Sequence, residues 1–297
     1  MNRIPRKVAL IGAKGMLARM VQASAPPHVA IHGFKRPEFD LTDAAQVRRS
    51  MEELRPEVII NCSAFTQVDL CESEEELATR VNGDGPGYLA AVARDLDATL
   101  MHVSTDYVFP GNAERPYREN DPTGPISAYG RSKLKGEQAI LESGLEKYFI
   151  VRTSWLYGPW GKNFVETILR LAAEREELRI VADQMGCPTF TGDLATAIFR
   201  LLDLEASQVS GGLYGIYHFA DEGQCSWYDF ACEIVSLARQ KGLPVKTRRI
   251  EPIKTEQFPL PAKRPAYSVF DTKKYKMAVA ASIPSWQKSL STYFEVR

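Results

Sequence analysis

The stretch KVALIGAKGMLARM, residues 7–20, decides the fold because it joins a short apolar run to a helical pattern through two glycines. The apolar run predicts a buried strand, and the residues from 16 onward predict a helix. Gly12 and Gly15 lie between them, where glycine permits a tight turn and a close approach of backbone N–H groups to a pyrophosphate. The spacing is shorter than the G-x-G-x-x-G fingerprint, and Ala18 stands where a third glycine would be. An ordinary strand-to-helix turn therefore stays an alternative.

Four further apolar runs follow, each separated from the next by a segment of helical pattern. They are VAIHGF (29–34), EVIINCSA (57–64), ATLMHVSTD (98–106) and KYFIVRTSW (147–155). The segment before the third of these runs predicts a long helix with a Gly/Pro interruption at residues 83–87. Strands that alternate with helices imply right-handed crossovers and a parallel sheet covered on both faces. We therefore predict an α/β fold with a Rossmann-like doubly wound sheet in residues 1–158.

The pattern becomes less regular after residue 158. Amphipathic helical patterns lie at residues 163–176 and 193–204, a strand pattern lies at GIYHFA (215–220), and a helix is predicted from residue 226 to 242. We interpret residues 159–297 as a smaller portion that binds mainly the substrate and is partly interleaved with the first.

The composition limits the function classes. Of the 297 residues, 44% are hydrophobic and 25% charged, which is typical of a soluble globular protein. Lys plus Arg and Asp plus Glu both number 37, and this balance argues against a nucleic-acid partner or an anionic membrane. The five cysteines form no Cys-x-x-Cys pair and the four histidines no ligand pattern, so we predict reduced thiols, a cytoplasmic protein and no metal site. No stretch approaches the roughly 18 apolar residues of a membrane span.

The motif YGRSK, which begins at Tyr129, follows the fourth predicted strand. On a helix, Tyr129 and Lys133 share one face. An ammonium near a phenol lowers the pKa of the phenol, which can then give a proton to a developing alkoxide. Ser104 and Thr105 end the fourth strand, and both should point at the crevice where such sheets bind ligands. Two residues on an ordinary helix surface are the alternative to this catalytic pair.

The end of the second predicted strand bears on the choice of cofactor. A carboxylate at this position favours NAD, whereas the chain has HGFKRPEFD from residue 32. Lys35 and Arg36 could bind the 2′-phosphate of NADPH. They could equally be solvated loop cations. Because these two cations stand where a carboxylate would favour NAD, we predict NADPH and keep NADH as the alternative.

Taken along its length, the chain resembles the extended short-chain dehydrogenase/reductases, and among them the dTDP-4-dehydrorhamnose reductase family. The similarity covers almost the whole chain. Its motifs include LIGAKGML, DLTD, VIINCSAFTQVDLCE, VNGDGPGYLA, HVSTDYVFPG, PYRENDPTGPISAYGRSKLKGE, VRTSWLYGPWGKNF, GIYHFADEGQCSWYDFA and RPAYSVFDT. The departures are Ala18 in place of a third glycine, and Cys62 and Phe65 where the family more often has Ala and either Tyr or His.

The resemblance implies a set of site residues. Thr105, Tyr129 and Lys133 match the catalytic triad of the family. With the glycine turn and the cations discussed above, the expected cofactor site comprises Gly12, Gly15, Met16, Leu17, Lys35, Arg36, Asp40, Leu41, Ser63, Ala64, Phe65, Thr66, Val103, Tyr129 and Lys133. The expected substrate site comprises Thr105, Asp106, Trp155 and Arg264.

Several of these residues could have a purely structural role instead. Trp155 could cover the C–H face of a hexose or simply pack, and Arg264 could bind a diphosphate or be a surface charge. Asn82 could orient the cofactor side or pack a helix. Trp227 lies at helical spacing with other aromatic residues, and we interpret it as core.

The residues that follow Thr105 separate two chemistries of the family. Related dehydratases have Asp-Glu after the Thr, whereas this chain has Asp106 and Tyr107. The resemblance therefore implies simple reduction of a dTDP-4-keto-6-deoxyhexose by NADPH or NADH, with a homodimer as a further possibility. The alternatives are a non-catalytic NADP-binding regulatory subunit, like that of methionine adenosyltransferase, and a reductase of another nucleotide sugar. The sugar, the product stereochemistry and a metal-supported dimer stay open.

Overall fold

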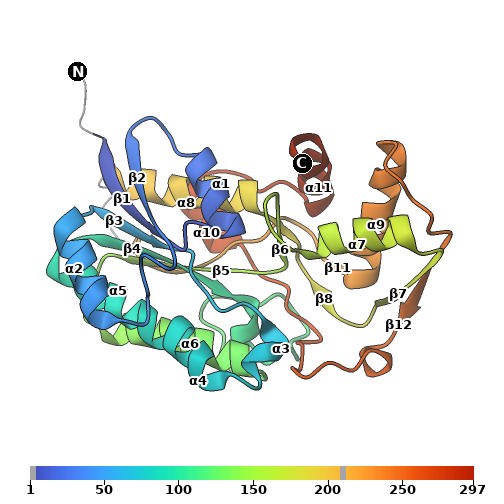
Figure 1. Cartoon of the computed structure of the whole chain (residues 1–297), viewed down its shortest axis with the longest axis horizontal. Coiled ribbons are helices and arrows are strands. Elements are labelled where there is room, and N and C mark those ends of the chain that lie inside the picture. The colour runs from blue at the N-terminus through green and yellow to red at the C-terminus, as the bar shows by residue number, and fades with distance from the viewer. Residues whose placement is uncertain (1–4, 208–211) are drawn as a thin grey trace.

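A six-stranded parallel sheet forms the centre of the protein, as the computed structural model in Figure 1 shows for residues 5–207 and 212–297. Its strand order is β10-β5-β4-β3-β1-β2, and every neighbouring pair is parallel. The strands are β1 (Arg6–Ile11), β2 (Val29–Phe34), β3 (Val58–Asn61), β4 (Thr99–Thr105), β5 (Tyr148–Thr153) and β10 (Gly215–His218). The predicted Rossmann-like α/β fold is confirmed.

Side chains alternate between the two faces of this sheet because successive residues of a strand point in opposite directions. In β1, Val8 and Leu10 join the core on one face, and Ala9 and Ile11 join the core on the other. Both faces are apolar because helices cover both, which explains why the strands read as continuous hydrophobic runs.

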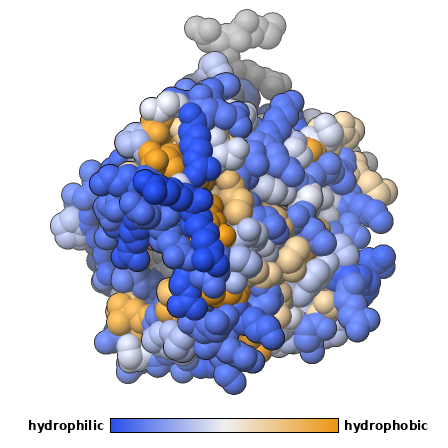
Figure 2. All heavy atoms as spheres, turned by 90° about the vertical axis from the view of Figure 1, so that its right-hand side faces the viewer, coloured by the Kyte–Doolittle hydropathy of each residue, from blue (hydrophilic) through white to orange (hydrophobic). Residues whose placement is uncertain are grey.

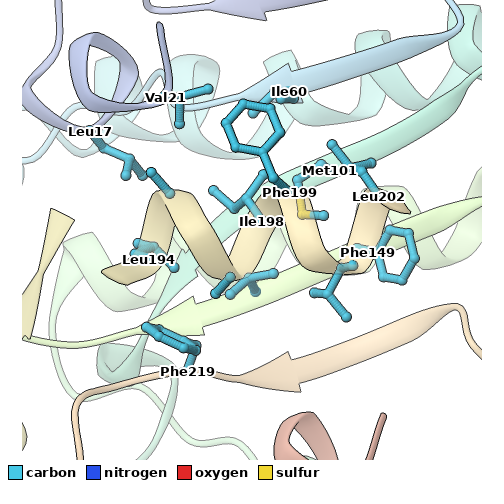
Figure 3. Packing of buried hydrophobic residues seen from close by; sticks show 14 of the residues in the cluster. Leu17, Val21, Ile60, Met101, Phe149, Leu194, Ile198, Phe199, Leu202 and Phe219 are labelled. Atoms are coloured by element: carbon cyan, nitrogen blue, oxygen red, sulfur yellow. The ribbon is translucent and has the colours of Figure 1, made fainter. Parts of the chain in front are cut away.

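Helices α1 (Met16–Ala23) and α8 (Thr191–Ala206) cover the first face. Figure 3 shows side chains of α8, among them Ile198 and Leu202, packed between α1 and the strands. Helices α2 (Ala44–Leu54), α5 (Gly85–Asp95) and α6 (Ala128–Glu142) cover the second face. The short helix α3 (Val68–Cys71) follows β3.

Elements from the second half of the sequence join the central sheet and the helices that cover it. Strand β10 pairs with β5, and α8 packs against α1, although both elements come from the second half of the sequence. Helix α10 (Lys273–Val279) then packs against α8 and β10. The predicted boundary at residue 158 stays a prediction.

A smaller region, here called the C-terminal lobe, has a core of its own. It comprises helices α7 (Phe164–Glu174), α9 (Trp227–Gln240) and α11 (Trp286–Val296) and three strand pairs. These pairs are β6 (Leu156–Tyr157) with β9 (Thr189–Phe190), β7 (Glu177–Val181) with β12 (Arg249–Ile253), and β8 (Met185–Gly186) with β11 (Cys225–Ser226). Figure 1 places α7, α9, β7 and β12 at the opposite end of the molecule from α2. Figure 2 shows that this end is largely hydrophilic, with apolar residues in small patches.

The predicted Gly/Pro interruption at residues 83–87 overlaps a π-helical turn, and the helix is not broken there. Helix α4 (Glu75–Thr79) continues through a π-helical turn at Arg80–Asp84 into α5. Pro86 lies in the first turn of α5, directly after the π-helical turn. The widened turn packs tightly on α6, because a Cβ added at Gly136 would lie 2.2 Å from the carbonyl oxygen of Asn82.

Within the part of the chain that the structure describes, no helix is both long enough and apolar enough to pass through a membrane.

Candidate active site

The turn between β1 and α1 has the geometry that its glycines predicted. Gly12 has a φ of +81°, and a Cβ there would lie 2.9 Å from the backbone of Ser63, so this position requires glycine. Gly15 is the N-cap residue of α1 and has no side chain to bind the free N–H groups. The structure describes every residue in the first turn of α1, and none of them is acidic. The N-terminus of α1 is therefore electrostatically suited to an anion. Ala18 is completely buried, and its methyl group packs in the core where a third glycine is not needed.

Three cations gather beside this turn at the end of β2. Lys35 and Arg36 are exposed, and the Nζ of Lys14 donates to the carbonyl oxygen of Arg36 at 3.3 Å. Arg36 also reaches Asp40 at 3.2 Å, while the backbone N–H of Thr42 is the main cause of the lowered pKa of that carboxyl. Sequence reasoning missed Lys14, although its position inside the glycine turn was a signal. Lys14 therefore lies beside Arg36, and Lys35 is the exposed residue that precedes Arg36 in the chain.

Leu41 differs from its expected role as a cofactor contact. Its side chain is buried, and a Cβ added at Gly85 would lie 2.6 Å from it. The side chain therefore belongs to the core between the sheet and α5, and the backbone alone is left for a cofactor.

The segment after β3 is held in place by Asn82. Asn82 Oδ1 accepts from the Phe65 N–H at 2.7 Å, and its Nδ2 donates to the Phe65 carbonyl at 3.1 Å and to Ser132 at 3.0 Å. Ser63, Ala64 and Thr66 flank this clamp and are half-buried or exposed. Asn82 thus fixes the loop of predicted cofactor contacts to α6, and its role toward a cofactor stays a prediction.

Thr105 and Tyr129 meet at the carboxyl end of β4, and both are buried. Burial raises the pKa of the Tyr129 phenol, and the Thr105 hydroxyl acts in the opposite direction. The Tyr107 ring packs edge-on against Tyr129 with centroids 5.4 Å apart. Thr105 Oγ1 donates to Asp106 Oδ1 at 2.9 Å, and burial raises the pKa of the Asp106 carboxyl to about 6. The site thus joins a protonated phenol, a hydroxyl and a carboxyl that titrates near neutrality.

Lys133 is also buried, but its amine is hydrogen-bonded to groups other than the Tyr129 phenol. Its Nζ donates to the Val103 carbonyl at 2.7 Å and lies 3.2 Å from Nε2 of His102. Burial lowers the pKa of Lys133 to about 8, against the opposing charge of Glu137. The expectation that Lys133 lowers the pKa of Tyr129 is therefore not met in this structure. Sequence reasoning also missed His102, whose signal was a lone histidine inside an apolar strand.

Ser104 does not point into the crevice, contrary to the prediction. Its hydroxyl donates to Glu137, which forms a buried ion pair with Arg152. The reason is the alternation along β4, which sends Ser104 and Thr105 to opposite faces.

Trp155 lies flat against Trp227 directly after β5. Their ring centroids are 3.5 Å apart and the planes differ by 8°. Trp155 has a φ of +46°, which is rare for a residue with a bulky side chain, and a Cβ on Gly186 would collide with its indole. Trp227 donates through Nε1 to Gln184 at 3.2 Å. The interpretation of Trp227 as core is incomplete, because this half-buried ring fixes the residue predicted to contact the sugar.

Arg264 lies in an ion pair rather than free for a diphosphate. Its guanidinium contacts both oxygens of Asp69, at 2.6 and 2.7 Å. This contact connects α3 with the segment before α10 and holds the pKa of the Asp69 carboxyl low. A diphosphate would have to compete with Asp69 for the guanidinium.

Residues 5–207 and 212–297 contain no group of three His, Cys, Asp or Glu side chains that could hold a metal ion. The five cysteines are free thiols.

Comparisons with known proteins match almost the whole chain. The family model described as the RmlD substrate binding domain matches residues 6–296. A dTDP-4-dehydrorhamnose reductase of Streptomyces griseus is 41% identical over 297 residues, covering 99% of this chain and 95% of the relative. A Streptomyces antibioticus protein named "Probable dTDP-4,6-dihydroxy-2-methyloxan-3-one 4-ketoreductase" is 38% identical and covers 96% of this chain and 93% of its own.

A crystal structure gives the same result for the fold. The dTDP-4-dehydrorhamnose reductase of Bacillus anthracis, solved in complex with NADP, superposes with a TM-score of 0.92 at 39% identity. The match covers 99% of this chain and 100% of that chain.

Proposed function

The chain belongs to the dTDP-4-dehydrorhamnose reductase family, and from this premise we propose that it reduces the 4-keto group of a dTDP-4-keto-6-deoxyhexose with NADPH. The names of its relatives favour dTDP-4-dehydrorhamnose as the substrate, and its reduction would give dTDP-L-rhamnose. The observation that carries the proposal is the buried pair of Thr105 and Tyr129 at the carboxyl end of β4, with Lys133 one helical turn further along α6.

The residues at the turn between β1 and α1 and at the end of β2 fit a dinucleotide with a 2′-phosphate. Gly12 leaves room for a backbone approach, and the N-terminus of α1 suits a pyrophosphate. Lys14, Lys35 and Arg36 supply positive charge where the 2′-phosphate of NADPH would lie. When bound, NADPH supplies the hydride that reduces the sugar ketone. NADPH is therefore favoured over NADH, in agreement with the NADP-bound relative from Bacillus anthracis.

The chain's own residues supply the proton and the orientation. Tyr129 carries its proton at neutral pH because burial raises the pKa of its phenol, so it can act as the acid that protonates the developing C4 alkoxide. The Thr105 hydroxyl lies beside the phenol. It donates to Asp106 Oδ1 in this structure, so it would have to turn away from that carboxyl to donate a hydrogen bond to the sugar oxygen. The indole of Trp155 would cover the sugar ring, and the distant dTDP group would hold the ketone in place.

Replacement of Tyr129 by Phe tests the assignment. Turnover, followed as NADPH oxidation with dTDP-4-dehydrorhamnose, should fall about 100- to 10,000-fold because general-acid catalysis is lost. NADPH affinity, measured by fluorescence titration, should change little. Tyr88→Phe on α5 is the matched control and should keep its turnover. Unchanged turnover in Tyr129→Phe would contradict the assignment.

A reductase of another nucleotide sugar is the second candidate. The relative from Streptomyces antibioticus carries the name of a ketoreductase for a different dTDP-sugar, at nearly the same identity. Comparison of kcat/KM across a panel of dTDP-keto sugars decides between these substrates. The regulatory-subunit alternative predicts that none of them is turned over. The homodimer stays a prediction.

A further inference from the structure

Three buried side chains form a polar chain behind the predicted active site. Asn61 at the end of β3, His102 in β4 and Lys133 in α6 are all at most 2% exposed. Asn61 Nδ2 lies 3.1 Å from His102 Nδ1, and His102 Nε2 lies 3.2 Å from Lys133 Nζ. No part of the mechanism above uses Asn61 or His102.

The orientation of the Asn61 amide fixes where His102 carries its proton. Asn61 Oδ1 accepts from the backbone N–H of Ser63 at 3.0 Å, so the Nδ2 group must face the imidazole. An amide nitrogen can only donate, and His102 Nδ1 must therefore be the unprotonated acceptor. The proton of a neutral His102 then lies on Nε2 and points at Lys133.

This tautomer is unfavourable for a charged lysine. An ammonium has three donors and no lone pair, so it cannot accept from Nε2–H. A neutral amine can accept that bond and can still donate to the Val103 carbonyl at 2.7 Å. The hydrogen bonds that join Asn61, His102 and Lys133 are all satisfied when Lys133 is uncharged. The bond between His102 and Lys133 is lost when Lys133 is charged.

The groups around Lys133 do not reverse this preference. Cys62 faces it from the segment after β3, and burial raises the pKa of that thiol, which keeps it neutral. Glu137, one turn along α6, favours the ammonium but is paired with Arg152 from β5. Burial lowers the pKa of His102 well below its ordinary value, so the imidazole is neutral.

We propose that His102, oriented by Asn61, is a positioning residue that holds the Lys133 amine against β4 and favours its uncharged form. This inference rests on the proposed function for its role in catalysis. After Tyr129 has given its proton to the sugar oxygen, the phenolate must regain one. Lys133 gives up a proton readily because the resulting amine accepts the Nε2–H of His102. The amine is hydrogen-bonded to His102 and Val103 and not to the phenol, so a bridging hydroxyl or water would have to carry the proton to the phenolate, and solvent would then return one to the amine.

The titration of Lys133 tests the proposal directly. With lysine labelled by ¹³C at Cε, the Lys133 signal is the one absent from Lys133→Met. It should titrate near pH 8 in the unchanged protein. His102→Gln offers a carbonyl oxygen to the ammonium, and a charge-assisted hydrogen bond should raise the midpoint by about 1 to 2 pH units. Asn61→Asp should also raise it, because a carboxylate accepts from Nδ1–H and turns Nε2 into an acceptor.

His28→Gln, a histidine that lies outside this network and contacts Asp203, serves as the control and should leave the Lys133 midpoint unchanged. An unchanged midpoint in folded His102→Gln and Asn61→Asp would overturn the proposal. The titration needs no substrate, so it is distinguishable from a failure of the proposed function, which would appear as absent turnover in the unchanged protein. A parallel shift of the basic limb of the kcat profile in His102→Gln would support the catalytic role.

Discussion

Arg152 and Lys133 are two cations buried to the same degree, yet their surroundings differ. Arg152 meets both carboxylate oxygens of Glu137 and the carbonyl of Glu119, and its guanidinium lies 5.0 Å from the Phe109 ring centroid. Lys133 meets one carbonyl and a neutral imidazole. Among the described residues, no carboxylate lies within ion-pair distance of its amine.

The difference separates a structural charge from a chemical one. A buried cation with a well-placed carboxylate stays charged and tolerates little change, because loss of either partner leaves the other uncompensated. A buried cation without such a partner titrates closer to neutrality and can exchange a proton during a reaction. Lys133 is therefore expected to cost stability, whereas Arg152 is expected to be needed for it.

The largest effect on stability is expected for Arg152→Met. The change leaves the Glu137 carboxylate buried without its cation, and the free energy of unfolding should fall by about 3 to 5 kcal/mol. Urea unfolding followed by circular dichroism measures this loss. Arg131→Met removes a half-exposed partner of Glu75 and should cost less than about 1 kcal/mol. Equal losses in the two variants would break the distinction between the buried and exposed pairs.

Lys133→Met is expected to act in the opposite direction. Near pH 7, replacement of an undercompensated buried cation by an apolar side chain of similar length should leave stability unchanged or raise it by up to about 3 kcal/mol. Turnover should nevertheless be lost. Lys135→Met, on the exposed side of the same helix, is the control and should keep its turnover. A strong destabilisation by Lys133→Met would contradict the comparison.

The pH dependence of stability sharpens the same point. The pKa of Lys133 is lowered from 10.5 to about 8 in the folded protein. Between these values the unfolded chain binds more protons at this site than the folded one, so this residue makes the stability rise with pH from about 8 to 10.5. Unfolding curves of the unchanged protein and Lys133→Met should therefore converge in that window.

A smaller effect is expected for the aromatic stack beside the site. Trp227→Leu removes the ring that holds Trp155, and an aromatic pair contributes about 0.5 to 1.5 kcal/mol beyond its buried area. The KM for the nucleotide sugar should rise about 2- to 10-fold with little change in kcat. Trp160→Leu, an exposed tryptophan, should leave KM unchanged. A large loss of kcat in Trp227→Leu would show that the stack acts in the chemical step.

The sequence predicts those features that depend on local pattern. The apolar runs that became β1 to β5 are continuous because both faces of the sheet are covered, and Gly12 is required by its positive φ. Tyr129 and Lys133 were found because helical spacing alone places them on one face. The sequence could not show that Asn61 faces His102, because a buried polar residue in a strand has the same pattern whether it packs or binds.

Contacts between distant segments account for the other differences. Trp227 looked like core because its neighbours have helical spacing, yet its partner Trp155 lies 72 residues earlier. Arg264 pairs with Asp69, which lies 195 residues earlier in the chain. Ser104 was misplaced for a different reason, since strand alternation would have assigned it to the face opposite Thr105.

Deuterium transfer tests the central claim most directly. NADPH carrying two deuterium atoms at carbon 4 of the nicotinamide is incubated with the purified protein and dTDP-4-dehydrorhamnose, and the product is examined by NMR. We predict oxidation of NADPH and dTDP-L-rhamnose with deuterium at carbon 4 of the sugar. Absence of NADPH oxidation, or a product without deuterium at that carbon, would contradict the assignment of this protein as a 4-keto sugar reductase.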